Sequence, residues 1–165
     1  MPRRCTVSTP LLRALSDVTG LAGPEAPPSV CRAVAELSRL FTRGRLSKRT
    51  PYLADSRCRL AYLSYYVPVN LAKVQALLDE LPADTGTSVS SGRLLALLDL
   101  GSGPGTAGLG VLDWVRQHPT LGRHPVDVLV VDQSEPALKD AERVWEAYVR
   151  SVPANSIRRP VGPTI

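Results

Sequence analysis

Two apolar runs in the second half of the chain have the pattern of buried β-strands. Residues 94–98 are Leu or Ala and precede Asp99, and Val126–Val131 is apolar except at Asp127 and precedes Asp132. Short apolar runs of this kind are typical of strands in parallel sheets, which are covered on their faces. A helical pattern over residues 106–117 lies between them. The sequence therefore predicts a strand, a crossover helix and a second, parallel strand.

Apolar positions at helical spacing predict five further helices. We expect Ser29 to cap one helix of the first half and Pro68 to break another. Near that break, Tyr62, Tyr65 and Tyr66 are expected to pack against one another, and stacking on RNA bases is the alternative. The five predicted helices cover residues 11–18, 29–41, 55–67, 70–81 and Glu135–Arg150.

These elements predict an α/β fold in which a helical N-terminal region precedes a βαβα unit. Two strands form an incomplete parallel sheet, because they leave ladder groups and apolar faces open. We expect this chain to be the front part of a longer protein, with a partner chain over the edge as the alternative. The predicted organisation is a flexible N-terminus at 1–28, a basic helical region at 29–82, a linker at 83–93, the βαβα domain at 94–150 and a disordered tail at 151–165.

A glycine-rich turn follows the first strand and predicts a bound polar ligand. Glycine allows backbone at positive φ to approach a ligand, and the helix that follows offers unpaired N–H groups. The turn lacks the lysine of a P-loop, and a dinucleotide fingerprint started at Gly101 puts Thr106 where close packing requires the smallest residues. The pattern acid-x-Gly-x-Gly-x-Gly, the first motif of class I S-adenosylmethionine-dependent methyltransferases, is matched by Asp99, Gly101, Gly103 and Gly105.

The end of the second strand supplies another acid, Asp132. A carboxylate there can accept both hydroxyls of an adenosine ribose, in S-adenosylmethionine or in NAD. We therefore expect one cofactor site where the two strands end. Its predicted residues are Asp99, Gly101, Ser102, Gly103, Gly105 and Asp132.

Two segments read together resemble a known family. Residues 59–74, Arg-Leu-Ala-Tyr-Leu-Ser-Tyr-Tyr-Val-Pro-Val-Asn-Leu-Ala-Lys-Val, and residues 98–107, Leu-Asp-Leu-Gly-Ser-Gly-Pro-Gly-Thr-Ala, are similar to the ribosomal-small-subunit-associated methyltransferase-like family, which includes bacterial proteins and the mitochondrial small-subunit assembly factor. The resemblance implies a Rossmann-like class I methyltransferase domain that binds S-adenosyl-L-methionine. It also implies that Asp99 and the three glycines surround the methionine part and that Asp132 holds the ribose.

The positive charge is concentrated in the first part of the chain. The net charge is +5, made up of +7 over residues 1–60 and −2 over residues 61–165. A segregated basic stretch suggests a polyanionic partner, and the resemblance implies small-subunit ribosomal RNA or the small subunit itself; a solvated surface is the alternative. The candidate RNA-binding residues are Arg39, Arg43, Arg45, Lys48, Arg49, Arg57 and Arg59.

Other patterns limit the classes of site. Cys5, Cys31 and Cys58 lie far apart, and His118 and His124 have no further ligand at suitable spacing, so we expect neither a metal site nor the iron–sulfur cluster of some family members. No apolar stretch is long enough for a membrane span. We expect a cytoplasmic protein, with the mitochondrial matrix as the alternative because the first residues are basic.

Three functions follow from these observations. The first is an S-adenosylmethionine-binding, methyltransferase-like protein that acts on or with small-subunit ribosomal RNA in ribosome assembly or translation. The second is an RNA-binding assembly factor without catalysis, and the third is an NAD-dependent enzyme. No catalytic residue is predicted, because the later strands that carry such residues in class I methyltransferases are not in this sequence.

Overall fold

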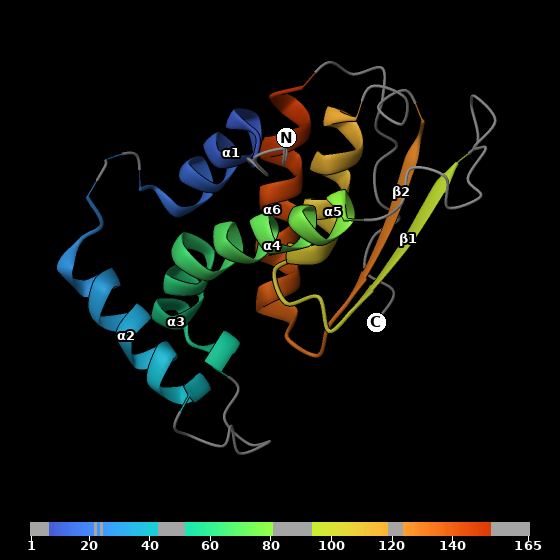
Figure 1. Cartoon of the computed structure of the whole chain (residues 1–165). Helices are drawn as coiled ribbons and strands as arrows, with labels where there is room; N and C mark the ends of the chain where they lie inside the picture. Colours follow the sequence, from blue (N-terminus) through green and yellow to red (C-terminus); the bar gives the residue numbers. More distant parts are fainter. Residues whose placement is uncertain are drawn as a thin grey trace.

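The computed structural model describes residues 7–21, 23, 25–42, 52–80, 94–118 and 124–152. The expected linker at 83–93, the candidate residues between 43 and 49 and the tail from 153 lie outside the described residues. Figure 1 shows the order of the elements along the chain. They are α1 (Thr9–Thr19), α2 (Pro28–Thr42), the 3₁₀ helix η1 (Tyr52–Ala54), α3 (Ser56–Ala61), the π-helix η2 (Tyr62–Tyr66), α4 (Val67–Asp79), β1 (Leu95–Leu100), α5 (Thr106–Gln117), β2 (Val126–Val131) and α6 (Glu135–Arg150).

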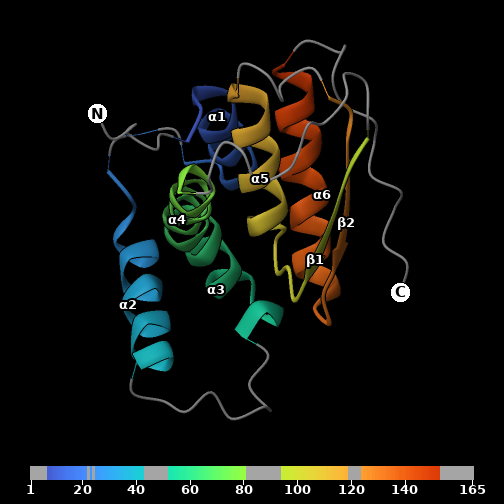
Figure 2. The ribbon, with the colours of Figure 1, turned by 45° about the vertical axis from the view of Figure 1, so that its right-hand side comes forward.

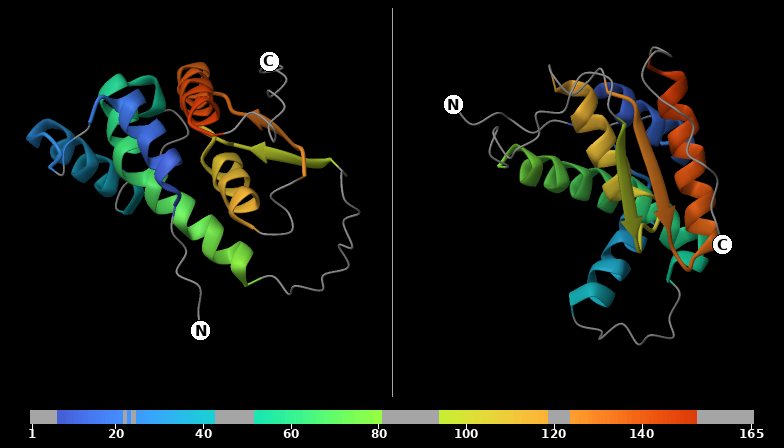
Figure 3. Two further views of the ribbon diagram at one scale, coloured as in Figure 1. Left: turned by 90° about the horizontal axis from the view of Figure 1, so that it is seen from above. Right: turned by 90° about the vertical axis from the view of Figure 1, so that its right-hand side faces the viewer.

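The two strands pair in parallel, as predicted, with Leu95 opposite Val126 and Leu100 opposite Val131. The helices lie on one side of this pair (Figures 2 and 3). On that side Val126 and Val128 are each 2 % exposed and belong to one apolar core with residues of α1, η2, α4, α5 and α6. The helical region and the βαβα unit therefore share a core, and the expected division between them is not a structural boundary. None of the described helices combines the length and apolar character needed to cross a bilayer.

Helix α1 belongs to this core, so the predicted flexible N-terminus contains a packed helix at Thr9–Thr19, and the prediction is wrong for these residues. Ser8 caps the helix, and Leu11 is fully buried. The helix packs along α6, as Figure 1 shows. The local sequence pattern could not indicate that α1 is packed, because its apolar surface is covered by elements that lie far along the chain.

A buried carboxylate joins four parts of the fold. Asp113 on α5 is 1 % exposed. It accepts hydrogen bonds from the backbone and hydroxyl of Ser8, from Gln75 Nε2 at 2.8 Å, from Gln117 Nε2 at 3.0 Å and from the Tyr148 hydroxyl at 2.8 Å. Burial, followed by the charge of Asp113, raises the pKa of Tyr148. This network satisfies a charge that would otherwise destabilise the core.

Two expected details of the helical region are wrong. Helix α2 begins at Pro28, so Ser29 lies within its first turn and is not the cap; proline suits that position because it has no N–H to leave unpaired. Pro68 does not break the chain's helical path, because α3 continues through η2 into α4. The wide turn of η2, closed by the Val67 N–H on the Tyr62 carbonyl, accommodates a proline in the first turn of α4.

The tyrosines of η2 pack with the aromatic rings around them, as expected. Tyr62 and Tyr66 stack with centroids 5.5 Å apart, and Phe41 meets Tyr52 and Tyr66 edge to face. These contacts connect α2, η1 and η2. A second apolar cluster beneath them contains Leu37 and Ala61, both fully buried.

The opposite face of the sheet is open. Leu98 and Leu100 of β1 are 55 % and 70 % exposed, and Leu129 and Val131, their partners in β2, are 37 % and 36 % exposed. An exposed apolar face is the feature predicted for an incomplete parallel sheet.

Candidate functional site

The glycine-rich turn lies at the carboxyl end of β1 and leads directly into α5. Gly101, Gly103 and Gly105 have φ values of 70°, 53° and 73°. At Gly105, which precedes the first residue of α5, a side chain would be strained, and a Cβ would lie 3.2 Å from the Cβ of Ala141. The turn is held to the second strand by hydrogen bonds from the Gly101 and Ser102 N–H groups to the Val131 carbonyl. The backbone thus adopts the conformation for which these glycines were predicted.

Asp132 lies against this turn. Its Oδ2 accepts a hydrogen bond of 2.8 Å from the Gly103 N–H, and its Oδ1 accepts one of 2.8 Å from the Ser134 N–H. The acid of the second strand and the glycines after the first strand, 29 residues apart, are therefore in direct contact. Each carboxylate oxygen has two lone-pair sites, so each can still accept a hydroxyl hydrogen bond from a ligand.

Asp99 lies on the helix side of the same turn. Its Oδ2 accepts a hydrogen bond of 2.8 Å from the Gly108 N–H in the first turn of α5. A carboxylate at this end of a helix is stabilised by the unpaired N–H groups and the helix dipole. Asp99 thus fixes the start of α5 relative to β1, and Asp132 fixes the turn relative to β2.

Gly108 was missed by the sequence analysis. A Cβ at this position would lie 2.9 Å from Val128 Cγ1, so α5 can approach β2 only with glycine here. Thr106 therefore does not disfavour a dinucleotide, because Gly108 makes the close contact between helix and strand. Gly103, Gly105 and Gly108 have the spacing Gly-x-Gly-x-x-Gly, which the sequence already displayed.

Two buried hydroxyl groups on the segments that follow the two strands make no hydrogen bond with the described residues. They are Thr106 Oγ1 at the start of α5 and Ser134 Oγ just before α6. Thr106 is 8 % exposed. Its hydroxyl is close enough to that of Tyr62 to affect the pKa of the phenol, yet it does not reach hydrogen-bond geometry with any described group. Buried polar groups without partners are uncommon and often mark sites that a ligand completes.

The described members of the basic set have different environments. Arg39 is exposed on α2, and Arg57 is exposed and pairs with Glu36 at 2.9 Å. The guanidinium of Arg59 is instead directed into the fold, where Nε lies 3.0 Å from Asp140 and Nη1 donates to the Leu53 and Ala54 carbonyls. Arg59 is therefore a structural residue, and we remove it from the RNA-binding candidates. The other candidates, Arg43, Arg45, Lys48 and Arg49, lie outside the described residues.

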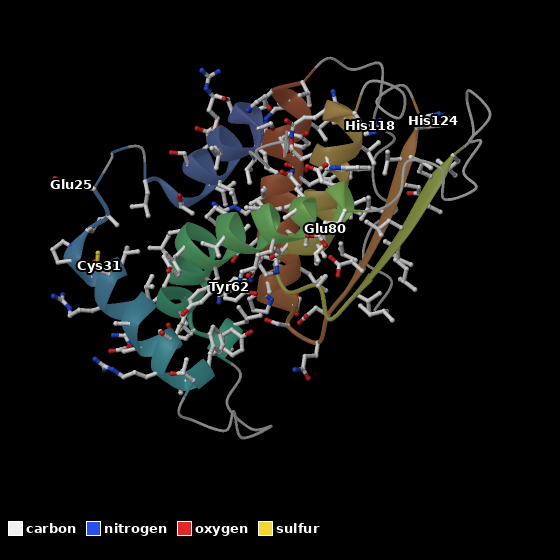
Figure 4. All side chains as sticks on the ribbon, in the orientation of Figure 1. Glu25, Cys31, Tyr62, Glu80, His118 and His124 are labelled. Carbon is white, nitrogen blue, oxygen red and sulfur yellow. The ribbon has the colours of Figure 1, made fainter. Side chains whose placement is uncertain are left out.

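The cysteines and histidines do not gather into a cluster in the described part of the chain. Cys31 is exposed on α2, Cys58 is buried in α3, and neither forms a disulfide. Among these residues no group of three or more His, Cys, Asp or Glu side chains has the arrangement of a metal site. His118, which follows α5, and His124, which precedes β2, are labelled in Figure 4.

Comparisons of the chain with protein-family models, with curated proteins and with solved structures gave no match.

Proposed function

We propose that the chain binds S-adenosylmethionine at the turn after β1 and is a methyltransferase-like protein that acts on or with small-subunit ribosomal RNA. The observation that carries this proposal is the hydrogen bond between the Gly103 N–H and Asp132 Oδ2. It joins a turn that matches the methyltransferase motif to an acid able to hold a ribose diol. In this arrangement Asp132 accepts the two ribose hydroxyls, and the backbone of the turn lies against the methionine part.

A binding experiment tests the cofactor. Isothermal titration of the whole chain with S-adenosylmethionine and S-adenosylhomocysteine should give saturable binding. Asp132→Ala should weaken it at least about 10-fold, because the diol loses a charged acceptor. Asp127→Ala, near the start of β2 and opposite Ala96, is the matched control and should bind as the native chain does. Absence of binding, or equal binding by both variants, would refute the proposal.

Because Asp132 also holds the turn through the Gly103 N–H, its substitution could weaken binding indirectly, and a second measurement separates the two effects. Adenosine should bind more tightly than 2′-deoxyadenosine to the native chain, and Asp132→Asn should reduce this discrimination. A variant that only disturbed the turn would weaken both nucleosides equally and leave their ratio unchanged.

A dinucleotide enzyme is the second candidate, because Gly108 supplies the close packing that such a fold requires. The two candidates share the adenosine part and differ in what is attached to it. Titration of NAD in competition with S-adenosylhomocysteine separates them: the proposal predicts that S-adenosylhomocysteine displaces NAD, and the reverse order of affinity would favour the dinucleotide.

The RNA partner is tested through its charge dependence. Small-subunit RNA should bind with an affinity that falls steeply with salt, and alanine at Arg43, Arg45, Lys48 and Arg49 should weaken it and reduce the salt slope. A matched variant loses four exposed positive charges elsewhere, at Lys73, Lys139, Arg143 and Arg150. Transfer of a labelled methyl group to the RNA would indicate an enzyme, and binding without transfer would favour an assembly factor.

A further inference from the structure

A segment of the helical region lies against the glycine turn. The 3₁₀ helix η1 contributes Leu53, which is 9 % exposed, and its Cδ1 is 3.7 Å from the position that a Cβ of Gly103 would take. Helix η1 also packs against α6. The turn after β1 therefore has the backbone of the sheet on one side and a piece of the helical region on the other.

Arg59 fixes this segment. Its guanidinium donates to the carbonyls of Leu53 and Ala54 at 3.1 and 2.9 Å and pairs with Asp140 of α6 at 3.0 Å. The side chains of Arg59 and Asp140 are 20 % and 10 % exposed. A largely buried ion pair with two further hydrogen bonds holds its geometry closely. Arg59 thus sets the position of η1 relative to α6 and, through α6, relative to the site.

Two aromatic rings, one from η1 and one from η2, lie beside each other. Tyr52 of η1 and Tyr62 of η2 are half-buried, with centroids 6.1 Å apart and planes inclined by 40°. Phe41 supports Tyr52 edge to face, and Tyr66 stacks on Tyr62. Figure 4 labels Tyr62, which lies beside α3. Each ring therefore packs against another aromatic ring and remains partly exposed to solvent.

Tyr52 directly precedes Leu53, which lies against the Gly103 turn that Asp132 holds, and Tyr62 lies beside Tyr52. Burial raises the pKa of each phenol, and the negative charge of Asp132 raises it further. The Tyr62 hydroxyl is also close to the buried hydroxyl of Thr106. The two rings, the acid and this hydroxyl come from η1, η2, the end of β2 and the start of α5, and these elements meet at the turn after β1.

We propose that Tyr52 and Tyr62 form the wall against which the flat base of a nucleoside lies while Asp132 holds its ribose, and that Arg59 is the positioning residue of this wall. The inference rests on the proposed function, because it places a nucleoside ligand at the same site. It adds that the helical region supplies part of the ligand site, so that the site is incomplete without η1. The geometry favours an aromatic base with a free 2′,3′-diol over an aliphatic or purely anionic ligand.

Isothermal titration with adenosine and with S-adenosylhomocysteine tests the wall. Tyr52→Leu should weaken both ligands about 5- to 50-fold, as loss of a base-stacking ring does, and Tyr52→Phe should bind within about 2-fold of the native chain. The matched control is Tyr65→Leu, which removes an exposed ring of η2 that touches Tyr66. It should bind as the native chain does.

The positioning role of Arg59 is tested by comparing the effect of a substitution on adenosine affinity with its effect on the melting temperature. Arg59→Lys keeps the charge and loses the planar contacts, so it should weaken adenosine about 3- to 10-fold while the preference for adenosine over 2′-deoxyadenosine stays unchanged, because Asp132 is intact. Arg57→Lys on the same helix is its control. A residue that merely stabilised the fold would lower the melting temperature of the chain and leave adenosine affinity unchanged at a temperature where the chain is folded.

The outcomes separate the two proposals. If Asp132→Ala loses nucleoside binding and Tyr52→Leu and Tyr62→Leu do not, the aromatic wall is refuted and the cofactor site stands. If the native chain binds no nucleoside, both are refuted. If a tyrosine variant fails to fold, Tyr52→Trp is used instead. Adding adenosine should change the tryptophan fluorescence of this variant more than that of the native chain, and the absence of such a change would refute the aromatic wall. Weaker binding of single-stranded RNA with unchanged adenosine affinity would assign the rings to RNA and also overturn it.

Discussion

The two faces of the strand pair are made of similar residues and have opposite environments. Val128 is 2 % exposed beneath the helices, and its neighbour Leu129 is 37 % exposed on the other face. The strands are apolar on both faces, so their sequence alone predicts that both are covered. The stability of the described fold therefore comes from the covered side of the sheet. The shared core, the Asp113 network and the Arg59 ion pair all lie on that side. The open face leaves the apolar character of the strands without a described partner.

The largest contrast is expected for a charge placed on each face. Val128→Asp should lower the free energy of unfolding by about 4 kcal/mol or more, because the carboxylate is buried without a partner. Leu129→Asp should cost about 1 kcal/mol or less, because the exposed carboxylate remains hydrated. Urea unfolding followed by circular dichroism measures both. Equal losses would show that the second face is also buried.

The next contrast compares a buried aspartate with one on β2. Asp113→Leu should cost about 3 kcal/mol, because it leaves Gln75, Gln117 and Tyr148 without their common acceptor. Asp127 is only partly buried and does not belong to such a network, so Asp127→Leu should change the free energy of unfolding by less than about 1 kcal/mol. Chemical denaturation at neutral pH gives both values, and similar values would mean that the network contributes little.

Two ion pairs extend the comparison to the helical region. Arg59→Gln should cost about 2 kcal/mol, since it leaves the nearly buried Asp140 with only the exposed Arg143 beside it. Arg57→Gln removes an exposed pair with Glu36 and should cost no more than about 0.5 kcal/mol. Thermal unfolding of the two variants in parallel tests this difference in stability. A higher salt concentration should hardly change the cost of Arg59→Gln, because the pair is largely buried.

The smallest expected effect is a change in pH dependence. Because folding raises the pKa of Tyr148 above its ordinary value of 10.0, the unfolded chain releases this proton first and stability falls as the pH rises above that value. Tyr52 and Tyr62 contribute in the same direction. Tyr148→Phe should cost about 1 kcal/mol at neutral pH and make the alkaline loss less steep. Denaturation curves from about pH 8 to pH 11 measure this slope, and an unchanged slope would contradict the burial of the phenol.

Local patterns were sufficient for the elements of the βαβα unit. The bounds of β2 and α6 are as predicted, and the parallel pairing brings Asp132 to the turn because the carboxyl ends of neighbouring parallel strands lie at one edge. The positive φ of the turn glycines was also predictable, since few other residues adopt it.

Contacts between distant segments could not be predicted in this way. The role of Arg59 depends on Asp140, 81 residues later, so the basic pattern around it suggested an RNA-binding residue or a solvated one and not a buried ion pair. The continuous path through Pro68 depends on the π-helix before it, which no residue pattern announces. Gly108 is different: its spacing was visible, and its importance becomes evident only where Val128 leaves no room for a side chain.

The docking of α1 on α6 has a consequence for synthesis of the chain. The Ser8 backbone and hydroxyl bind a carboxylate 105 residues later, and Leu11 enters a core completed by the last described helix. Contacts that are this distant in sequence form slowly, because a large loop must close first. During translation the first helix emerges long before its binding surface exists, so its apolar face stays uncovered until the ribosome has delivered α6.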